Sequence, residues 1–553
     1  MIRIQKITMI VAVALLAGCA VGPNYKVPES TLSNQWVTPA DKWTISTIPQ
    51  EQQWWRNFND EKLNELIARA YEGNLDLKVA EARVRQARES RIVASSPLLP
   101  VVGAGASATR RRNSEDVVSK QRKPKVKPAG PPDVHNLGGP PAFDAHGHPV
   151  AAPSTLVVTR NPTIISRGVD PYSNLFEAGF DAQWELDFFG GTRRAREAAS
   201  ADLQAAQENQ RDVLVILLGE VARNYVELRG QQRQLAVSRN NAESQRSTLE
   251  LTGTRMRAGL ATDLDVARAE AQLATTEASI PSFEARLQAA IYRLSVLTGQ
   301  EPGALQAELV DPQPIPAVPS DVSFSAPADL VRRRPDVRAS ERNLAAETAR
   351  IGVAKADLYP KFTLNGSLGL ATSDIDKIST GSSKQFSFGP SVSIPLFNAG
   401  QLRARVRAQR ARADEAMATY KNTILAALEE ADNALTALSR ERVRRDALVR
   451  AVESNRRAVK LSNDLYKQGL TDFLSVLDTQ RELFQSESLL ADSETRVSTN
   501  LVAAYKAMGG GWEVFLPPAD GDSATKDAPA PGESDKGTAT EPAPATPAAE
   551  NTK

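Results

Sequence analysis

Several stretches of the chain alternate between apolar and polar side chains, one residue at a time. The clearest covers residues 176–188, and similar alternation occurs in residues 361–370 and 385–394, with a weaker stretch at 100–110. In the first of these, the apolar set is Phe176, Ala178, Phe180, Ala182, Trp184, Leu186 and Phe188, and the polar set includes Glu177, Asp181, Glu185 and Asp187. A period of two predicts β-strands with one apolar face and one face that would line water.

Between these strands the pattern changes to the helical period. Apolar residues recur at steps of three and four, and no proline occurs in residues 191–259 or 400–469. Each stretch predicts a helix about 100 Å long, at ~1.5 Å per residue. Gly259 and Gly469 follow these helices and suit left-handed C-terminal caps, so we expect them to mark the turns at the tips of two helical hairpins. The returning helices should cover about residues 262–298 and 471–508.

The two halves of the chain resemble each other. Gly191, Arg194, Ala195 and Arg196 fall on Gly400, Arg403, Ala404 and Arg405 at a shift of 209 residues. After a slip of one residue, Leu251, Gly259, Leu264 and Val266 match Leu461, Gly469, Leu474 and Val476. Such similarity over more than a hundred residues indicates a duplicated unit.

These patterns divide the chain into six parts. A first repeat (61–301) and a second repeat (328–516) each hold a helix, two strands and a long helical hairpin. The first repeat also carries a loop insert, 113–170, rich in Pro and Gly. The remaining parts are a signal peptide at 1–18, an N-terminal extension at 19–60, a proline-containing linker at 302–327 and a tail without aromatic residues at 517–553, which we expect to be disordered.

The N-terminus has the features of a bacterial lipoprotein signal. Arg3 and Lys6 precede a short apolar run, and Leu16-Ala-Gly-Cys19 resembles a lipobox, which predicts cleavage before Cys19 and its lipidation. Ala20 after the cysteine favours passage to the outer membrane. The alternative is an ordinary signal peptide with an incidental cysteine.

The strands, rather than a helix, are the candidates for crossing a membrane. Later apolar runs fall short of the ~18 residues that a spanning helix needs. Four strands leave open edges, which are costly in lipid, so a spanning subunit needs partners. Three copies would give a barrel of twelve strands. The alternative for the strands is a soluble sandwich, which the long helices between them disfavour.

Composition removes several function classes. The 67 basic and 66 acidic residues give a net charge of +1, which argues against a nucleic-acid partner. The only cysteine is Cys19, and His135, His146 and His148 all lie in the loop insert. No Cys–His pair or His-based triad can therefore form in the helical body, so an enzyme is not expected, and neither is a cofactor. His146 and His148 beside Asp144 could bind a metal ion, but incidental histidines in a mobile loop are the favoured interpretation.

Several motifs resemble those of a known family, the TolC-like outer membrane factors of tripartite efflux pumps, in the NodT-type lipoprotein branch. The resemblance covers roughly residues 19–516 and rests on five stretches together with the tip segment 466–478. The five stretches are Cys19–Pro28, Trp184–Gly190, Arg334–Arg338, Leu358–Pro360 and Pro395–Gly400.

The resemblance implies a homotrimer, mainly α-helical, with a twelve-stranded outer-membrane β-barrel that continues into a periplasmic α-helical barrel. It implies a passive exit duct whose partners are outer-membrane lipid, a periplasmic membrane-fusion adaptor and an inner-membrane RND-type transporter. A periplasmic coiled-coil adaptor or scaffold lipoprotein without a pore is the alternative function. A cell-wall or lipid enzyme is disfavoured for want of a catalytic group.

The resemblance also implies a periplasmic gate near the hairpin tips. Leu474 would form an apolar constriction and Asp478 a ring of carboxylates. By its position in the repeat, Asp265 is the acidic candidate of the first half. Tyr466 and Arg481 would hold the tips shut through hydrogen bonds or ion pairs. Thr471 stands where some relatives have a basic gate residue. A simpler interpretation of Asp265 and Asp478 is that each favours the first turn of its helix.

Overall fold

The computed structural model describes residues 20–28, 35–37, 43–45, 50–112, 172–319 and 322–516. The predictions that concern the signal peptide, Cys19, the loop insert with its histidines and the tail lie outside these residues.

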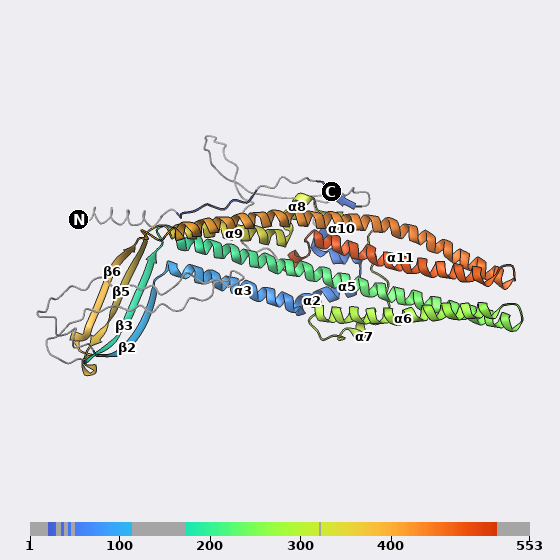
Figure 1. The fold of residues 1–553 in the computed structure, drawn as a ribbon, viewed down its shortest axis with the longest axis horizontal. Helices are drawn as coiled ribbons and strands as arrows, with labels where there is room; N and C mark the ends of the chain where they lie inside the picture. The colour runs from blue at the N-terminus through green and yellow to red at the C-terminus, as the bar shows by residue number, and fades with distance from the viewer. Residues whose placement is uncertain are drawn as a thin grey trace, which may run out of the picture. The chain divides into compact units, whose positions relative to one another are not determined.

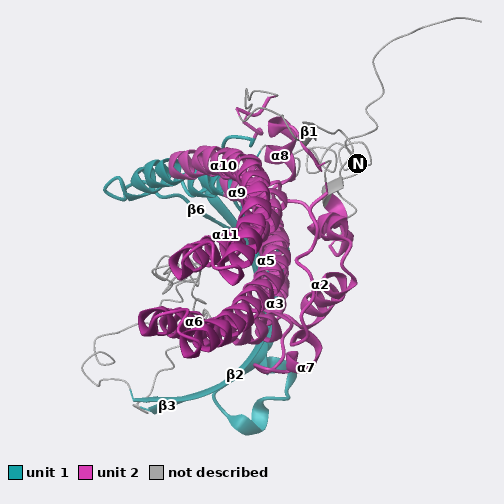
Figure 2. Cartoon of the chain, turned by 90° about the vertical axis from the view of Figure 1, so that its right-hand side faces the viewer, with its two compact units in different colours: residues 1–25, 89–199, 347–412 teal, residues 26–88, 200–346, 413–553 magenta. Residues whose placement is uncertain are grey.

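The described chain forms two compact units, coloured separately in Figure 2. Unit 1 contains residues 1–25, 89–199 and 347–412, and unit 2 contains residues 26–88, 200–346 and 413–553. Each unit takes segments from both sequence repeats. The division by contacts therefore cuts across the division by sequence.

Unit 1 contains the predicted strands, which form one antiparallel sheet (Figure 1). The strands are β2 (Val101–Arg112), β3 (Tyr172–Leu186), β5 (Lys361–Thr372) and β6 (Lys384–Ser393). Their order in the sheet is β2-β3-β5-β6. The two strands of each repeat are therefore neighbours, and the pairing of β3 with β5 joins the first repeat to the second. All four predicted strands are confirmed.

The long helices also begin and end close to the predicted residues. They are α5 (Gly191–Arg257) with α6 (Asp263–Leu297), and α10 (Gln401–Lys467) with α11 (Phe473–Ala507). Within unit 2, ion pairs join the two helices of each hairpin, such as Arg246–Glu277 at 2.8 Å and Arg456–Glu487 at 2.8 Å.

A glycine in the left-handed conformation ends each outgoing helix. Gly259 has φ 73° and Gly469 has φ 76°. The N–H of Leu260 donates to the carbonyl of Arg255, and the N–H of Leu470 donates to that of Leu465, at 2.8 and 2.9 Å. This bond closes the helix end as in a Schellman motif, and a side chain at the glycine position would strain it.

One prediction needs correction: each repeat begins with two helices rather than one. The first repeat has α2 (Glu61–Gly73) and α3 (Leu75–Ser95), and the second has α8 (Pro327–Arg333) and α9 (Pro335–Ala356). Asn74 ends α2, and its side chain accepts a hydrogen bond from Leu77 N–H at 3.0 Å in the next helix. Arg334 precedes a proline, which disfavours the helical conformation at that residue.

The structure also refines the alignment of the repeats. α5 begins at Gly191 and α10 at Gln401, 210 residues later, and α6 and α11 end at Leu297 and Ala507, again 210 apart. Strands β2 and β5 begin at Val101 and Lys361, 260 residues apart, and end at Arg112 and Thr372 with the same separation. The slip of one residue expected within the long helices, from a shift of 209 to one of 210, is absent from the helix boundaries.

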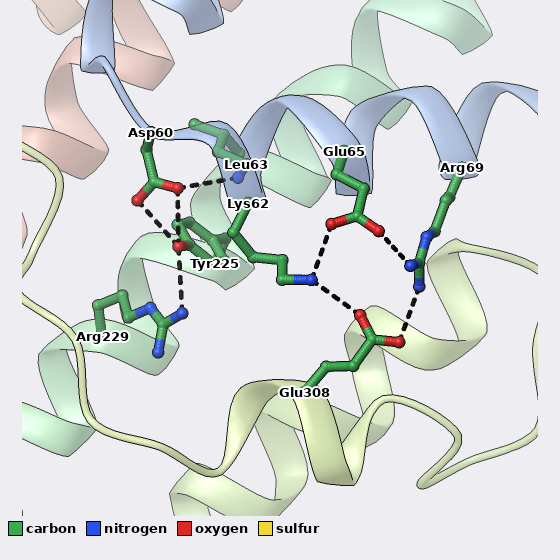
Figure 3. A network of polar contacts seen from close by, with 8 residues as sticks. All are labelled: Asp60, Lys62, Leu63, Glu65, Arg69, Tyr225, Arg229 and Glu308. Atoms are coloured by element: carbon green, nitrogen blue, oxygen red, sulfur yellow. Dashed lines mark hydrogen bonds and ion pairs between the residues drawn. The ribbon is translucent and has the colours of Figure 1, made fainter.

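The expected linker contains ordered elements. Residues 302–327 include the short helix α7 (Gln306–Leu309) and strand β4 (Val322–Phe324), which pairs in parallel with β1 (Trp43–Ile45). Figure 3 shows how α7 is fixed: Lys62 and Arg69 of α2 both donate to Glu308, at 2.9 and 3.0 Å. These contacts lower the pKa of Glu308 below its usual range. These contacts hold α7 against α2 within unit 2.

A second part of this network joins α2 to the long helix α5. Asp60 accepts hydrogen bonds from Leu63 N–H at 3.0 Å and from the Tyr225 hydroxyl at 2.9 Å (Figure 3). Arg229 donates to Tyr225 at 3.2 Å and to the carbonyl of Asp311 at 3.0 Å. Burial raises the pKa of Tyr225 to about 12, so its hydroxyl stays protonated and remains a donor.

Candidate functional site: a two-faced sheet and the hairpin tips

The sheet of unit 1 exposes large apolar side chains on one face. Phe180, Leu368 and Phe386 lie directly opposite one another on three successive strands, and their exposed fractions are 61%, 64% and 83%. Exposed apolar rows of this extent mark a surface that contacts an apolar environment. In contrast, hydrogen bonds between polar side chains cover the other face, including Ser367 to Ser387 at 2.8 Å and Asn365 to Ser391 at 3.2 Å. The sheet therefore suits lipid on one side and water on the other.

The helices give a complementary observation. Among the residues that the structure describes, no helix is long and apolar enough to cross a membrane.

Asp187 has a different place from the one expected for it. It follows the last residue of β3, and its carboxylate accepts hydrogen bonds from Thr192 N–H at 3.0 Å and from Arg193 N–H at 2.9 Å. Asp187 therefore caps the beginning of α5, where a negative charge is favourable, instead of continuing the polar face of the strand.

The residues that follow Cys19 are held in a tight cradle in unit 1. Val21 N–H donates to the carbonyl of Phe189 at 3.0 Å, and Arg194 donates to the carbonyl of Val21 and to Asn24, at 3.3 and 2.6 Å. A Cβ added at Gly22 would lie 2.5 Å from the Cα of Gly352, so a larger residue would not fit there. Cys19 lies outside the described residues, but its neighbour is fixed beside the end of β3.

At the tips of the hairpins in unit 2, side chains from both repeats form one apolar cluster. Its buried members from the second repeat are Tyr466, Phe473, Val476 and Leu477, and they pack with Ala269 of α6. Leu249 and Leu251 of α5 pack against this cluster from the side. The second hairpin thus supplies most of the buried bulk, and the first hairpin supplies the surface that receives it.

Tyr466 is at the centre of this contact, but it acts differently from the prediction. Its side chain is only 3% exposed, and the guanidinium of Arg255 lies 4.6 Å from the centre of its ring. Arg255 also donates to the carbonyl of Lys467 at 3.3 Å. The Tyr466 hydroxyl has no hydrogen-bond partner among the described residues. A cation–π contact and apolar packing therefore hold it, in place of the expected hydrogen bond or ion pair.

Arg481 makes a second link between the hairpins. Its Nε donates to the side-chain oxygen of Gln272 on α6 at 2.7 Å, so the contact is a hydrogen bond to a neutral amide. Sequence reasoning found Tyr466 and Arg481 but missed their partners in the first hairpin, which are Arg255 and Gln272, respectively. No periodic or motif signal marks either residue.

The remaining predicted gate residues separate into two groups. Leu474 is 42% exposed and Asp478 is exposed, and Asp478 makes no hydrogen bond or ion pair with the described residues. Asp265 instead belongs to a capping box, in which its carboxylate accepts from Thr262 N–H at 3.0 Å. The first-turn interpretation therefore fits Asp265. Asp478 lies beyond the first turn of α11, which Asp472 caps by accepting from Ser475 N–H at 3.1 Å.

Metal binding was the one ligand chemistry that the sequence left open. Within residues 20–112 and 172–516, apart from their gaps, no three His, Cys, Asp or Glu side chains gather closely enough to hold a metal ion. The predicted His146 and His148 lie outside the described part of the chain.

An amphipathic four-stranded sheet and two long helical hairpins from a duplicated sequence define a class of protein, the outer-membrane channels that continue as helices into the periplasm. The sequence matches the family "Outer membrane efflux protein" over residues 66–300 and 326–510. Nodulation protein T of Rhizobium leguminosarum bv. trifolii is 32% identical over 502 residues, covering 90% of this chain and 96% of that protein. The pyoverdine export outer membrane protein OpmQ of Pseudomonas putida is 30% identical, covering 87% and 94%.

A solved structure of the outer-membrane channel OprN is similar in fold, with a TM-score of 0.75 and 34% identity over 90% of this chain and all of that one. The chain therefore belongs to the family of outer membrane efflux proteins. It is an outer-membrane channel, and the predicted fold class, efflux function and outer-membrane location are confirmed.

Proposed function

We propose that this chain is the exit duct of a tripartite pump, held shut by contacts between its two hairpin tips, and not an enzyme. Three copies form the duct, and Cys19 carries the lipid anchor. A periplasmic membrane-fusion adaptor and an inner-membrane transporter of the RND type are its partners. Family membership and the contacts at the tips support this proposal.

The observation that carries the gate is the pair of links between hairpins. Arg255 on the Tyr466 ring and Arg481 on Gln272 each join the second hairpin to the first within one copy. The Arg255–Tyr466 link lies in the last turns of α5 and α10, and the Arg481–Gln272 link lies eight or nine residues after the first residues of α11 and α6. Moving one hairpin outward from the other would break both links and uncover the apolar cluster of Tyr466 and Phe473. The closed arrangement is therefore the one that these contacts favour.

Exposed groups next to this cluster would form the constriction itself. Leu474 and Asp478 project from α11 beside the buried cluster and are free to meet their copies in a trimer. An apolar ring of Leu474 resists hydration, and a ring of Asp478 carboxylates attracts cations. Opening then requires an adaptor that binds the splayed arrangement more tightly than the closed one.

The transported compound is selected elsewhere in the pump. Relatives of similar identity carry names as different as nodulation protein T, pyoverdine export protein and toluene efflux pump protein. We infer that this duct passes what its transporter delivers, and that its tips decide when it opens rather than what it carries.

A double-mutant cycle at the second link tests the gate. Arg481→Ala, Gln272→Ala and the double variant are reconstituted in planar bilayers, and the conductance of the resting channel is measured. Because both changes break one hydrogen bond, each should raise the conductance by a similar factor and the double variant by little more. Arg496→Ala is the matched control, since Arg496 on the same helix pairs only locally with Asp492, at 2.9 Å.

Unchanged conductance in Arg481→Ala and Gln272→Ala would contradict the proposal. So would fully additive effects, because these would mean that the two residues act on the resting channel independently. An equal increase in Arg496→Ala would show a general loss of stability instead of a gate.

A further inference from the structure

The two repeats differ at the connection between the second strand and the long helix. In the first repeat, this connection is covered within the chain: Phe188 packs edge-on against Phe362, with ring centres 4.9 Å apart, and Phe189 stacks on Tyr359 at 4.6 Å. In the second repeat, Leu396 and Phe397 of the corresponding connection are 92% and 89% exposed. The connection between strand and long helix is therefore covered by aromatic side chains in the first repeat and exposed in the second.

A second bare apolar segment lies at the opposite edge of the sheet. Leu99, Val101 and Val102, at the beginning of β2, are 69%, 67% and 66% exposed. In the second repeat, the corresponding residues 260 positions later are Tyr359, Lys361 and Phe362, and two of these are the residues that cover Phe188 and Phe189. At the separation of 210 residues, Leu396 and Phe397 correspond to Leu186 and Asp187, which immediately precede the packed Phe188 and Phe189, and Leu186 pairs with Phe362. The bare connection and the bare strand start therefore occupy the two sides of the junction that β3 and β5 make within the chain.

We infer that residues 394–397 of one copy pack on residues 99–102 of the next copy, in the strand register that places Val392 opposite Ala106. A second copy of this chain is the partner because the strand order β2-β3-β5-β6 leaves β2 and β6 at the two edges. The inference rests on the proposed assembly of three copies and adds which residues meet in it.

The register follows from the one observed between the repeats. β3 and β5 pair with Ala182 opposite Gly366 and Asp181 opposite Ser367. Within the first repeat Val101 pairs with Gln183, and within the second Lys361 pairs with Ser393. Since β5 repeats β2 at a separation of 260 residues, these two pairings show that β6 repeats β3 at a separation of 210. The same junction between copies therefore places Val392 opposite Ala106 and Ser391 opposite Ser107.

The chemistry of the faces agrees with this register. Ser107 already donates to Glu177 on the polar face at 3.4 Å, and Ser391 accepts from Asn365 on the same face. Placing Ser391 opposite Ser107 continues that polar row across the junction. Val392 and Ala106 lie on the apolar face with Phe386. A register shifted by one residue would bring apolar side chains among the polar ones, which a half-buried sheet strongly disfavours.

The helices next to this edge are also complementary in size. Within the chain, α9 approaches α5 closely at Gly352, where an added Cβ would lie 2.7 Å from the Cγ of Arg194. The corresponding residues at the junction between copies are Ile92 of α3, which is 59% exposed, and Ala404 of α10, which is exposed. Within the chain, α9 carries the glycine and α5 the large side chain. At the junction between copies, α3 carries the large side chain and α10 the small one, so the two helices can keep the same spacing.

Paired cysteines test the register on the full-length, membrane-inserted protein. The only native cysteine, Cys19, is the proposed lipid anchor, so introduced thiols supply the pair. Directly opposite residues of antiparallel strands have Cα atoms about 4.5–5.5 Å apart, within the range for a disulfide. Val392→Cys with Ala106→Cys probes the apolar face, and Ser391→Cys with Ser107→Cys probes the polar face. Val392→Cys with Ala104→Cys or with Ala108→Cys are the controls, each displaced by two residues.

We expect mild oxidation to link the two facing pairs into covalent trimers at least about tenfold faster than the displaced pairs, because displaced residues lie roughly 7–8 Å apart. Faster linking in a displaced pair, or no linking in either facing pair of a native trimer, would overturn the register. The mass of the non-oxidised assembly in detergent is measured in parallel. A mass that excludes a trimer would overturn the proposed function together with the inference, whereas a trimer with a different linking pattern would overturn the inference alone.

Discussion

The tips of the two hairpins have the same backbone but different side chains. Both turn at a glycine with positive φ, and both return through a helix whose first residue lies four positions after that glycine. At the positions of Tyr466 and Phe473 in the second tip, the first tip has Met256 and Asp263. Tyr466 and Phe473 are buried, while Met256 is half-buried and Asp263 is exposed.

In the proposed gate, this difference gives the two repeats separate roles. The second tip carries the bulk that must be buried, and the first tip carries the receiving surface of Leu249, Leu251 and Arg255. Two identical tips would have no reason to prefer each other in one arrangement. Two complementary tips favour the arrangement in which the bulky side chains of the second tip are buried against the first tip. The proposed adaptor would compete with that contact.

The charged positions differ in the same sense. At the separation of 210 residues between the repeats, the counterpart of Asp478 is Arg268 and the counterpart of Asp265 is Ser475. Asp265 is therefore not the counterpart of Asp478 in the first half, and it is engaged in its capping box. Only the second tip carries an exposed carboxylate beyond the first turn at this position.

The largest expected effect comes from removing the bulk of the second tip. Tyr466→Ala should raise the conductance of the resting channel by at least about tenfold, because truncating a buried aromatic side chain loses roughly 3–5 kcal/mol of packing. Met256→Ala, the same change in the first tip, should alter the conductance far less. Bilayer recordings of both variants check this. Equal effects would remove the distinction between the tips.

An intermediate effect is expected from the charges. Asp478→Ala should raise the leak of the resting channel about two- to threefold and lower its preference for cations, since a ring of carboxylates attracts cations at the constriction. Arg268→Ala should leave the leak nearly unchanged. Reversal potentials in a salt gradient measure the preference. An unchanged leak and an unchanged reversal potential in Asp478→Ala would count against its place in the gate.

The smallest effect concerns the caps. Hydrogen bonds from the hydroxyl and the N–H of Ser475 lower the pKa of Asp472 below its usual 3.8, so this cap stabilises the second tip above that pH and weakens as the pH falls through the lowered value. Thr262, its counterpart in the first tip, cannot titrate. Hydrogen exchange at Ser475 should lose protection below about pH 4 in the native protein but not in Asp472→Asn. The same loss in both proteins would assign it to another group.

Sequence reasoning recovered what depends on local period. Alternation located the strands, and the absence of proline together with a glycine at each end located the long helices. The break at Asn74 was missed, and the extended backbone of this residue together with its capping bond to Leu77 reveals two helices. The first-turn interpretation of Asp265 rested on its place near the start of a helix, and its capping box with Thr262 agrees with that interpretation.

The contacts between the hairpins could not be predicted in this way. Arg255 and Tyr466 are 211 residues apart, as their numbers show, and the position of Arg255 is held by Leu465 in the other repeat. Neither periodicity nor the internal repeat therefore points to the pair. The resemblance places the expected gate at the second tip, and the structure identifies the residues of the first tip that contact this tip.

A reversible lock across the two tips is the most direct test of a gate held by contacts between the hairpins. In the double variant Gln272→Cys and Arg481→Cys, the hydrogen bond between α6 and α11 is lost. A bifunctional thiol reagent that contains a disulfide then links the two cysteines across the space that the long Gln and Arg side chains fill in the native protein. The conductance of one reconstituted channel is measured with the link intact and after reduction has cut it. We expect a low conductance with the link intact and a clearly higher one after reduction. The same conductance in both states, with the link shown to form, would contradict the proposed gate.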